Sequence, residues 1–230
     1  MPKVAYSEAQ REQIRRDLVA VGLELMTKQG IQHTTVEQIY QKVGISRSFF
    51  YTFFPTKEDL VVEMLYLQQP RVVAYARQLL ADPKLDWRQA VTRFLRICCY
   101  GERNGIAVLT VEEQQKIFHR LSPESYQSFR EKQQRLFGQL MEIFGVRPTP
   151  ERISLFTNLC LAVMVIQRAI PGSLPLLVPE AAEATIDVQI NSIVDWLASL
   201  RAQDAQNQYL CGPFGPFLRC FSNGPFFSSQ

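Results

Sequence analysis

The sequence predicts an all-α protein. Apolar side chains recur at helical spacing along most of the chain, as at Ile14, Leu18 and Val21, whereas strand-like alternation never persists for long. Hydrophobic residues make up 47% of the 230 residues and charged residues 20%, which is ordinary for a globular protein that buries a core. This length fits one large domain, or a small domain joined to a larger one.

Capping signals mark where the first helices begin. Ser7 and Gln10 have the spacing of a capping box, and Thr35 and Gln38 repeat that spacing before a second helix. A glycine is expected to end each of these two helices. Caps, breakers and periodicity together predict helices at residues 7–30, 35–44, 46–54, 57–80 with Pro70 as a kink or break, 86–100, 108–121, 122–144, 149–170 and 180–202.

The segment GISRSFFYTFFPTKEDL, residues 44–60, combines rings that suit a core with polar side chains that suit a surface. If Ser46 caps a short helix, a step of about 100° per residue puts Phe50 and Phe54 on its buried face. Ile45 and Phe50 then have the spacing of a hydrophobic staple. The other side carries Ser48 and Thr52 at its centre, Phe49 and Tyr51 on its flanks, and Arg47 at the first turn.

A helix, a tight turn at residues 43–45 and a second short helix make a helix-turn-helix, here at about residues 35–54. In that motif the second helix enters the major groove, while neighbouring elements hold phosphates. A polar helix-turn-helix face also occurs in protein-binding modules, so a helical adaptor without DNA binding is the alternative. The candidate DNA-binding residues are Thr35, Ser46, Arg47, Ser48, Phe49, Tyr51, Thr52 and Lys57.

Residues 11 to about 66 resemble the N-terminal DNA-binding domain of TetR-type (TetR/AcrR) transcriptional regulators. The resemblance is carried by the ordered set of an amphipathic first helix ending at Gly30, TVEQI at 35–39, VGISR at 43–47, Phe50-Tyr51 before Phe54, and TKEDL at 56–60. It implies a helix-turn-helix domain at residues 1–66 and a larger helical domain at 67–202 that dimerises and binds a ligand. A Gly-, Pro- and Phe-rich tail without helical period follows at 203–230.

The resemblance also implies roles for single residues. Residues 46–52 match the recognition helix, Tyr51 and Lys57 match phosphate-contacting positions, and Thr35 matches a phosphate-facing helix start. Two positions depart from the family pattern, because Phe49 replaces a small or polar residue and Phe53 replaces histidine or another polar residue. Phe49 either contacts bases, for example a thymine methyl group, or packs down onto the domain.

The last two expected helices suggest a dimer interface. The final helix has an apolar seam with coiled-coil-like steps of four and three residues, and the helix before it is apolar nearly all round. The resemblance implies a four-helix interface between two subunits, and a homodimer would bind a palindromic operator. The alternative is that both helices pack only on their own domain. The predicted interface residues are Leu159, Val163, Ile166, Ile186, Ile190, Ile193 and Leu197.

A ligand pocket is expected in the larger domain. Aromatic and sulfur-containing side chains there suit a cavity for a small apolar or aromatic compound, and they suit an ordinary core equally well. The candidates are Phe94, Cys98, Phe118, Tyr126, Phe129 and Phe137.

Composition bounds the other function classes. The net charge is only +3, and residues 1–60 hold eight Lys and Arg against seven Asp and Glu, so any argument for DNA depends on where charges lie. The two histidines accompany no catalytic, cofactor or metal-binding motif, so neither an enzyme nor a bound metal or cofactor is expected.

The five cysteines lack zinc-type spacing and are expected to be reduced thiols, although Cys98-Cys99 is the pair that would serve a redox switch. We expect no membrane partner and a cytoplasmic location, since no secretory signal or bilayer-length apolar run occurs.

Overall fold

The protein is described by a computed structural model that covers residues 6–100, 115, 117, 119–169 and 178–210. Every regular element in these ranges is helical, which confirms the predicted all-α fold. The elements are α1 (Glu8–Gln29), α2 (Val36–Val43), α3 (Arg47–Phe50), α4 (Lys57–Ala81), α5 (Trp87–Cys99), α7 (Pro123–Ile143), α8 (Pro150–Ala169), a 3-10 turn (Pro179–Ala181) and α9 (Ala182–Leu210).

The predicted caps begin these helices. Ser7 and Thr35 each form a complete capping box with the glutamine three residues later. Gly44 ends α2 with φ of 79°, in the left-handed region that favours glycine. The predicted helix at 108–121 falls largely outside the described residues, although Gln115, Ile117, His119 and Arg120 are helical.

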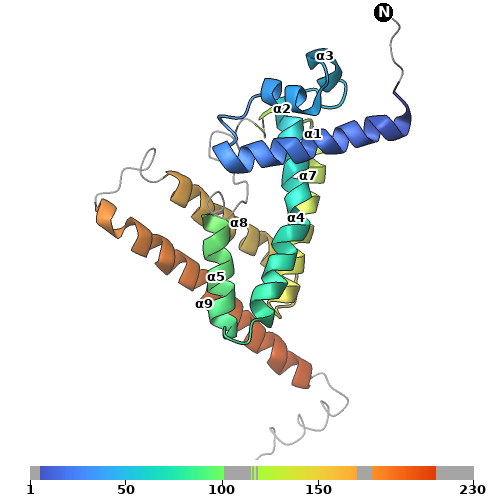
Figure 1. The fold of residues 1–230 in the computed structure, drawn as a ribbon. Helices are drawn as coiled ribbons and strands as arrows, with labels where there is room; N and C mark the ends of the chain where they lie inside the picture. Colours follow the sequence, from blue (N-terminus) through green and yellow to red (C-terminus); the bar gives the residue numbers. More distant parts are fainter. Residues whose placement is uncertain (1–5, 101–114, 116, 118, 170–177, 211–230) are drawn as a thin grey trace, which may run out of the picture.

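Helix α4 joins two groups of helices (Figure 1). Its first half packs with α1 and its second half with α5, while α7 runs beside both halves and contacts Tyr66 of the first half through Phe129 and Lys132. The helix continues through Pro70, so the expected break at this position does not occur. Leu67, just before Pro70, is 49% exposed and lies between the two packed halves.

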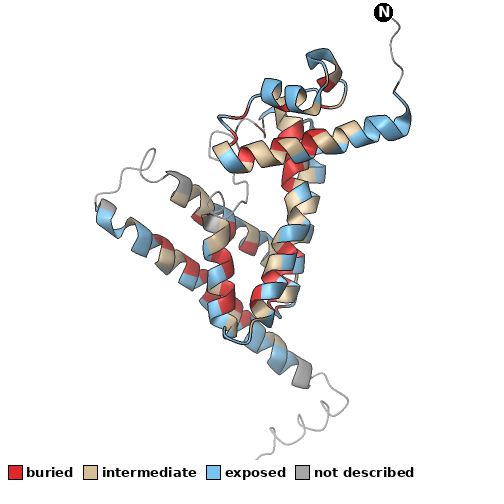
Figure 2. Ribbon diagram, in the orientation of Figure 1, coloured by how far each residue is buried: buried red, intermediate tan, exposed pale blue. Residues whose placement is uncertain are grey.

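Buried side chains form two cores, one at each end of α4 (Figure 2). The N-terminal core is built around Leu18, Ile39, Phe50 and Leu60, and the C-terminal core around residues of α4, α5, α7, α8 and α9. Residues from beyond the predicted boundary at 66 also join the N-terminal core, because Ile117 is buried in it and Leu121 and Phe129 pack against it. Near the same place, Arg120 Nη1 lies 2.8 Å from Glu58 Oε1 in the first turn of α4.

The last helix extends eight residues further than the sequence predicted, to Leu210 instead of 202. Asp204 lies in this extension. Its Oδ2 accepts a hydrogen bond from the Arg147 backbone N–H at 2.8 Å, and Arg152 Nη1 donates to both of its oxygens at 2.8 and 2.9 Å. This network fastens the end of α9 to the loop before α8. The predicted tail therefore begins no earlier than residue 211, and residues 211–230 lie outside the described residues.

We expect Asp204→Asn to lower the free energy of unfolding by about 1–3 kcal/mol, because it weakens charge-assisted hydrogen bonds at a site that is only 18% exposed. Burial by itself would raise the pKa of Asp204, but the Arg147 and Arg152 hydrogen bonds and the charge of Arg152 outweigh burial and hold this pKa below its usual range. A lowered folded-state pKa contributes stability above the unfolded pKa that is lost as pH falls through the folded value.

Urea unfolding at several pH values checks this prediction. The difference between wild type and Asp204→Asn should be full at neutral pH and should shrink as the solution is acidified below about pH 4. Asp195→Asn is the matched control, because Asp195 is 65% exposed and its ion pair with Arg88 should contribute little. Equal losses in the two variants at neutral pH would contradict a special role for Asp204.

Candidate nucleic-acid interface

The short helix α3 exposes the polar face that the sequence predicted. Phe50 is 0% exposed and Phe54 is 1% exposed, so both rings anchor α3 to the N-terminal core. Ile45 packs against the same core, as expected for a hydrophobic staple. Ser46, Arg47, Ser48 and Thr52 are exposed, and Tyr51 is 40% exposed.

The helix itself is shorter than predicted, since only residues 47–50 are helical and a turn follows. The Ser46 hydroxyl accepts a hydrogen bond from the Phe49 N–H at 3.2 Å and so caps the helix. The Thr52 hydroxyl donates to the Phe49 carbonyl at 2.7 Å, which leaves its oxygen lone pairs and its methyl group for an outside partner. A four-residue helix cannot hold its shape by propensity, so the buried rings must position this face.

Arg47 is the exposed cation of α3. Its guanidinium lies 6.0 Å from the centroid of the Tyr51 ring, and within the described ranges it makes no ion pair. The Tyr51 ring in turn meets the buried Phe50 ring edge to face at 5.3 Å. A guanidinium beside an aromatic ring keeps its N–H groups free to bind an oxygen acceptor. The two residues therefore present a cation and a phenol together at the surface.

Phe49 packs against the start of α1, which agrees with one of the two roles left open by the sequence; a contact of this half-buried ring with bases stays a prediction. Its ring stacks on Tyr6 with centroids 4.8 Å apart and meets Phe53 edge to face at 5.0 Å. The Arg11 guanidinium lies 5.6 Å from the Phe49 centroid and 5.0 Å from the Phe53 centroid. The two residues that depart from the family pattern are thus partners of each other and of α1. Sequence reasoning missed Tyr6 and Arg11, because no local spacing links α1 to α3.

Thr35 and Lys57 lie at helix starts. Thr35 is exposed, and its hydroxyl accepts a hydrogen bond from the Gln38 N–H at 3.2 Å. Lys57 is half-buried, and its ammonium donates to the Ile31 carbonyl at 2.7 Å in the loop before α2. Lys57 therefore joins the start of α4 to the segment that leads into α2.

An ion-pair cluster ties α2 to α1. Glu24 on α1 lies 2.7 Å from the ammonium of Lys28 and 2.8 Å from that of Lys42 on α2. Hydrogen bonds and charge from these two lysines lower the pKa of Glu24 to about 2. Lys28 and Lys42 share the single negative charge of Glu24, so the positive charge of Lys42 is only partly offset.

The five candidate ligand residues that the structure describes do not gather in one place. Phe94 and Phe137 are buried in the C-terminal core, and Cys98 packs against it. Phe129 packs against the N-terminal core instead, and Tyr126 is 38% exposed. Phe118 lies outside the described residues. Each described candidate is therefore a core or a surface residue in this structure. The sequence had left an ordinary core open as the alternative to a pocket.

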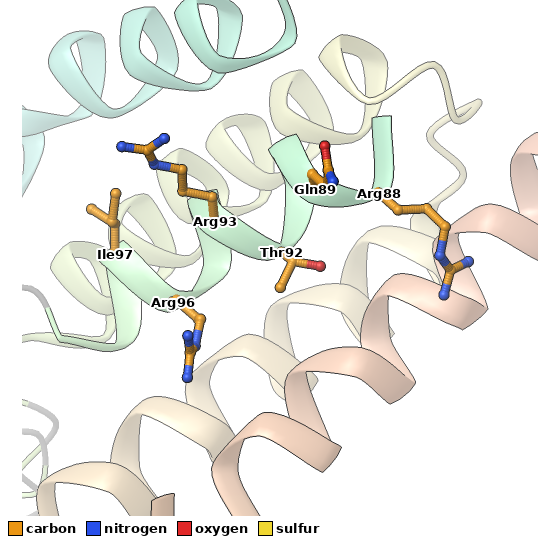
Figure 3. A pocket seen from close by; sticks show the side chains of 6 residues that line it. All are labelled: Arg88, Gln89, Thr92, Arg93, Arg96 and Ile97. Atoms are coloured by element: carbon orange, nitrogen blue, oxygen red, sulfur yellow. The ribbon is translucent and has the colours of Figure 1, made fainter. Parts of the chain in front are cut away.

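A groove of about 490 Å³ runs along α5 and is lined by Arg88, Arg93, Arg96 and three further residues (Figure 3). Arg88 and Arg96 extend toward α9, where they pair with Asp195 and Asp187, while Arg93 points away from α9. Two of the three arginines are thus neutralised, and they brace α5 against α9. None of the five described candidate ligand residues lines this groove.

The predicted dimer residues require a correction. Ile186, Ile190, Ile193 and Leu197 are only 0–3% exposed within a single chain, and Val163 is 4% exposed. Leu159 and Ile166 are half-buried and pack against the edge of the same core, so their place in an interface stays a prediction. The apolar seam of the last helix therefore builds the core of its own domain, which was the alternative, and it is not free to meet a partner. The exposed apolar side chains of α8 and α9 are instead Leu155 at 47%, Leu161 at 37% and Val188 at 65%.

These features define the N-terminal unit as a helix-turn-helix domain. Residues 18–64 match the family model for bacterial regulatory proteins of the tetR family. The resemblance of the N-terminal domain to the TetR family is thus confirmed. A search of curated proteins found no match.

Solved structures share the fold of the chain as a whole. A TetR transcriptional regulator from Rhodococcus sp. RHA1 is similar with a TM-score of 0.56 and 15% identity, over 83% of this chain and 97% of that one. RolR, in a complex with resorcinol, is similar with a TM-score of 0.50 and 14% identity, over 82% of this chain and 96% of that one. At these identities the likeness concerns the fold, which is a helix-turn-helix domain joined to a larger helical domain.

Two further properties concern only the described part of the chain. None of its helices combines the length and the hydropathy needed to span a bilayer. No three of its His, Cys, Asp and Glu side chains gather as ligands for a metal ion.

Proposed function

We propose that this protein is a sequence-specific DNA-binding transcriptional regulator, acting as a homodimeric repressor on a palindromic operator. The observation that carries the proposal is the face of α3, which holds Arg47, Ser48 and Thr52 outward above the buried rings of Phe50 and Phe54. Small hydroxyl side chains allow close approach to base edges, and an arginine can bind guanine or a phosphate through two hydrogen bonds. We assign contacts with the DNA backbone on either side to Tyr51, Lys57 and the start of α2 at Thr35.

A dimer is part of the proposal because one short helix contacts too few base pairs to select a site. The exposed sides of α8 and α9 support a dimer, because their apolar side chains Leu155, Leu161 and Val188 are solvent-exposed in the single chain. Two copies meeting through this surface would bury them by two-fold symmetry.

The proposal includes a small-molecule ligand in the C-terminal domain. RolR, which shares the fold, was solved with resorcinol, and that supports a small apolar or aromatic ligand for the C-terminal domain here. Phe94 and Phe137 in the C-terminal core and Cys98 packed against it stay candidate contacts, with Tyr126 and Phe129 as further candidates. The candidate Phe118 lies outside the described residues. Such a ligand releases the operator only to the extent that it binds the DNA-incompetent state more tightly.

A mobility shift with the full-length protein and the DNA flanking its own gene tests DNA binding, at low and moderate salt and with an unrelated duplex as competitor. We expect a complex that resists the competitor and weakens steeply with salt, because phosphate contacts release counterions. A folded protein that shifts no DNA even at low salt would favour the adaptor alternative.

Tyr51→Phe and Arg47→Ala separate the two kinds of contact. Tyr51→Phe removes one hydroxyl and should weaken binding several-fold on all sequences, as expected for a phosphate contact. Arg47→Ala should weaken binding by about 1–3 kcal/mol and should relax base preference at one position of each half-site. Competition with single-base variants of the bound fragment measures both effects. Unchanged affinity in both variants would exclude this face as the DNA-binding surface.

A further inference from the structure

We propose that Arg11, at the start of α1, is a further DNA-contacting residue that binds a backbone phosphate beside the recognition helix. This inference rests on the proposed function and adds an element that the sequence did not suggest. Its basis is the cluster of three rings, Tyr6, Phe49 and Phe53, that lies beside the Arg11 side chain. We call these three rings the aromatic cradle.

The aromatic cradle holds the Arg11 guanidinium at a fixed place. Two rings at 5.0 and 5.6 Å attract the cation through their π-faces, and the rings support each other edge to face at 5.0 Å. The Tyr6 ring stacks on the Phe49 ring, with centroids 4.8 Å apart and an interplanar angle of 20°. The start of α1 is therefore tied to α3 at two points, which lowers the entropy lost when Arg11 binds an oxygen acceptor.

Arg11 lies at the edge of the face already assigned to DNA. Arg11, Thr52 and Phe53 line one surface groove of about 420 Å³ between α1 and the turn that follows α3. Thr52 is at the centre of the outward side of the recognition segment, and its hydroxyl is held by the Phe49 carbonyl. A duplex that contacts Thr52 would therefore bring its sugar-phosphate backbone close to Arg11, on the other side of this groove.

No acidic side chain in the described ranges pairs with Arg11, so its guanidinium is available to bind a phosphate. Arg11 is exposed and makes no hydrogen bond or ion pair through its guanidinium to any residue in the described ranges. Its neighbour Arg15 is different, because it lies 3.4 Å from Glu63 and over the Phe54 ring. Glu8 and Glu12 also line the groove, so the groove as a whole is not basic. The expected contact is thus a single phosphate held by one guanidinium, not a broad electrostatic attraction.

The experiment compares full-length Arg11→Gln, Arg11→Lys and Arg16→Gln on the fragment that wild type binds. Arg16 is the matched control, since it is an exposed arginine of the same helix whose guanidinium donates to Gln13 and makes no contact with the aromatic cradle. Affinity is measured across a range of salt concentrations, and the slope of log K against log salt is the readout. Thermal unfolding of each variant confirms that the exposed substitutions leave the fold intact.

We expect Arg11→Gln to reduce the magnitude of the salt slope by about 1.8 for a dimer, from two lost phosphate contacts at about 0.9 each, and to weaken binding roughly tenfold or more. Arg11→Lys should keep most of the slope because it keeps the charge, and Arg16→Gln should match wild type. A wild-type slope in Arg11→Gln overturns the proposal, whatever its affinity, because it would mean that Arg11 only braces α3. Failure of wild type itself to bind any DNA would instead refute the proposed function and this inference with it.

Discussion

Phe50→Ala is expected to lower the free energy of unfolding by about 3–5 kcal/mol and to abolish operator binding. Phe50 is 0% exposed, and its ring meets those of Tyr51 and Phe54 at 5.3 and 5.9 Å. Alanine leaves a cavity beneath a helix of only four residues. Since such a helix has almost no stability of its own, its exposed face loses its orientation together with the ring.

Urea unfolding and a mobility shift on the same preparations measure the two effects. Tyr51→Phe is the control, because it retains the ring on Phe50 and removes only an exposed hydroxyl. We expect its stability to match wild type while its DNA affinity falls several-fold. A Phe50→Ala protein that unfolds like wild type would show that the core does not position α3 as described.

Gly22→Leu is expected to destabilise the N-terminal domain by about 3 kcal/mol, at the upper end for an overpacked core. Gly22 lies where α1 crosses α4, and an added Cβ would come within 2.6 Å of Met64 Sδ and 3.4 Å of Leu60 Cδ2. A larger side chain must push the two helices apart. Because α4 carries Lys57 and α1 carries Arg11, separating them should also weaken DNA binding.

Two companion variants test this explanation. Gly22→Ala should be nearly neutral, because the end of the flexible Met64 side chain can shift and alanine gains about 1 kcal/mol of helix propensity over glycine. Met64→Ala combined with Gly22→Leu should recover part of the lost stability by removing the clashing atoms. If the double variant is as unstable as the sum of the single changes, contact with Met64 is not the cause.

The parts of the fold that follow local rules could be predicted from the sequence. The capping boxes at Ser7 and Thr35, the left-handed Gly44 and the inward rings of Phe50 and Phe54 each depend on residues within a few positions of one another. The outward face of α3 follows from the same period, so the candidate DNA-binding surface was also predictable.

Features that depend on distant parts of the chain were not predictable. The place of Phe49 depends on Tyr6 and Arg11, and the true end of α9 depends on Arg147 and Arg152. An apolar seam indicates burial, but a periodic pattern does not say whether the covering surface belongs to the same chain. That is why the inward residues of α9, such as Ile190, were assigned to a subunit interface.

The contact between the two domains is also long-range. Ile117 enters the N-terminal core and Arg120 pairs with Glu58, so the chain just before α7 lies against the first turn of α4. No local pattern in the sequence links these positions, which is why this contact between the domains could not be predicted.

In the proposed function, two copies of α3 bind an inverted repeat. Selection from a pool of random duplexes of about 30 base pairs, by full-length wild type and by Arg47→Ala, tests it directly. We predict that wild type enriches an inverted repeat whose half-sites lie about one or two helical turns apart, and that Arg47→Ala enriches the same repeat with one position relaxed in each half. Enrichment of no sequence by folded wild-type protein, or of the same sequence at unchanged stringency by Arg47→Ala, would contradict the account.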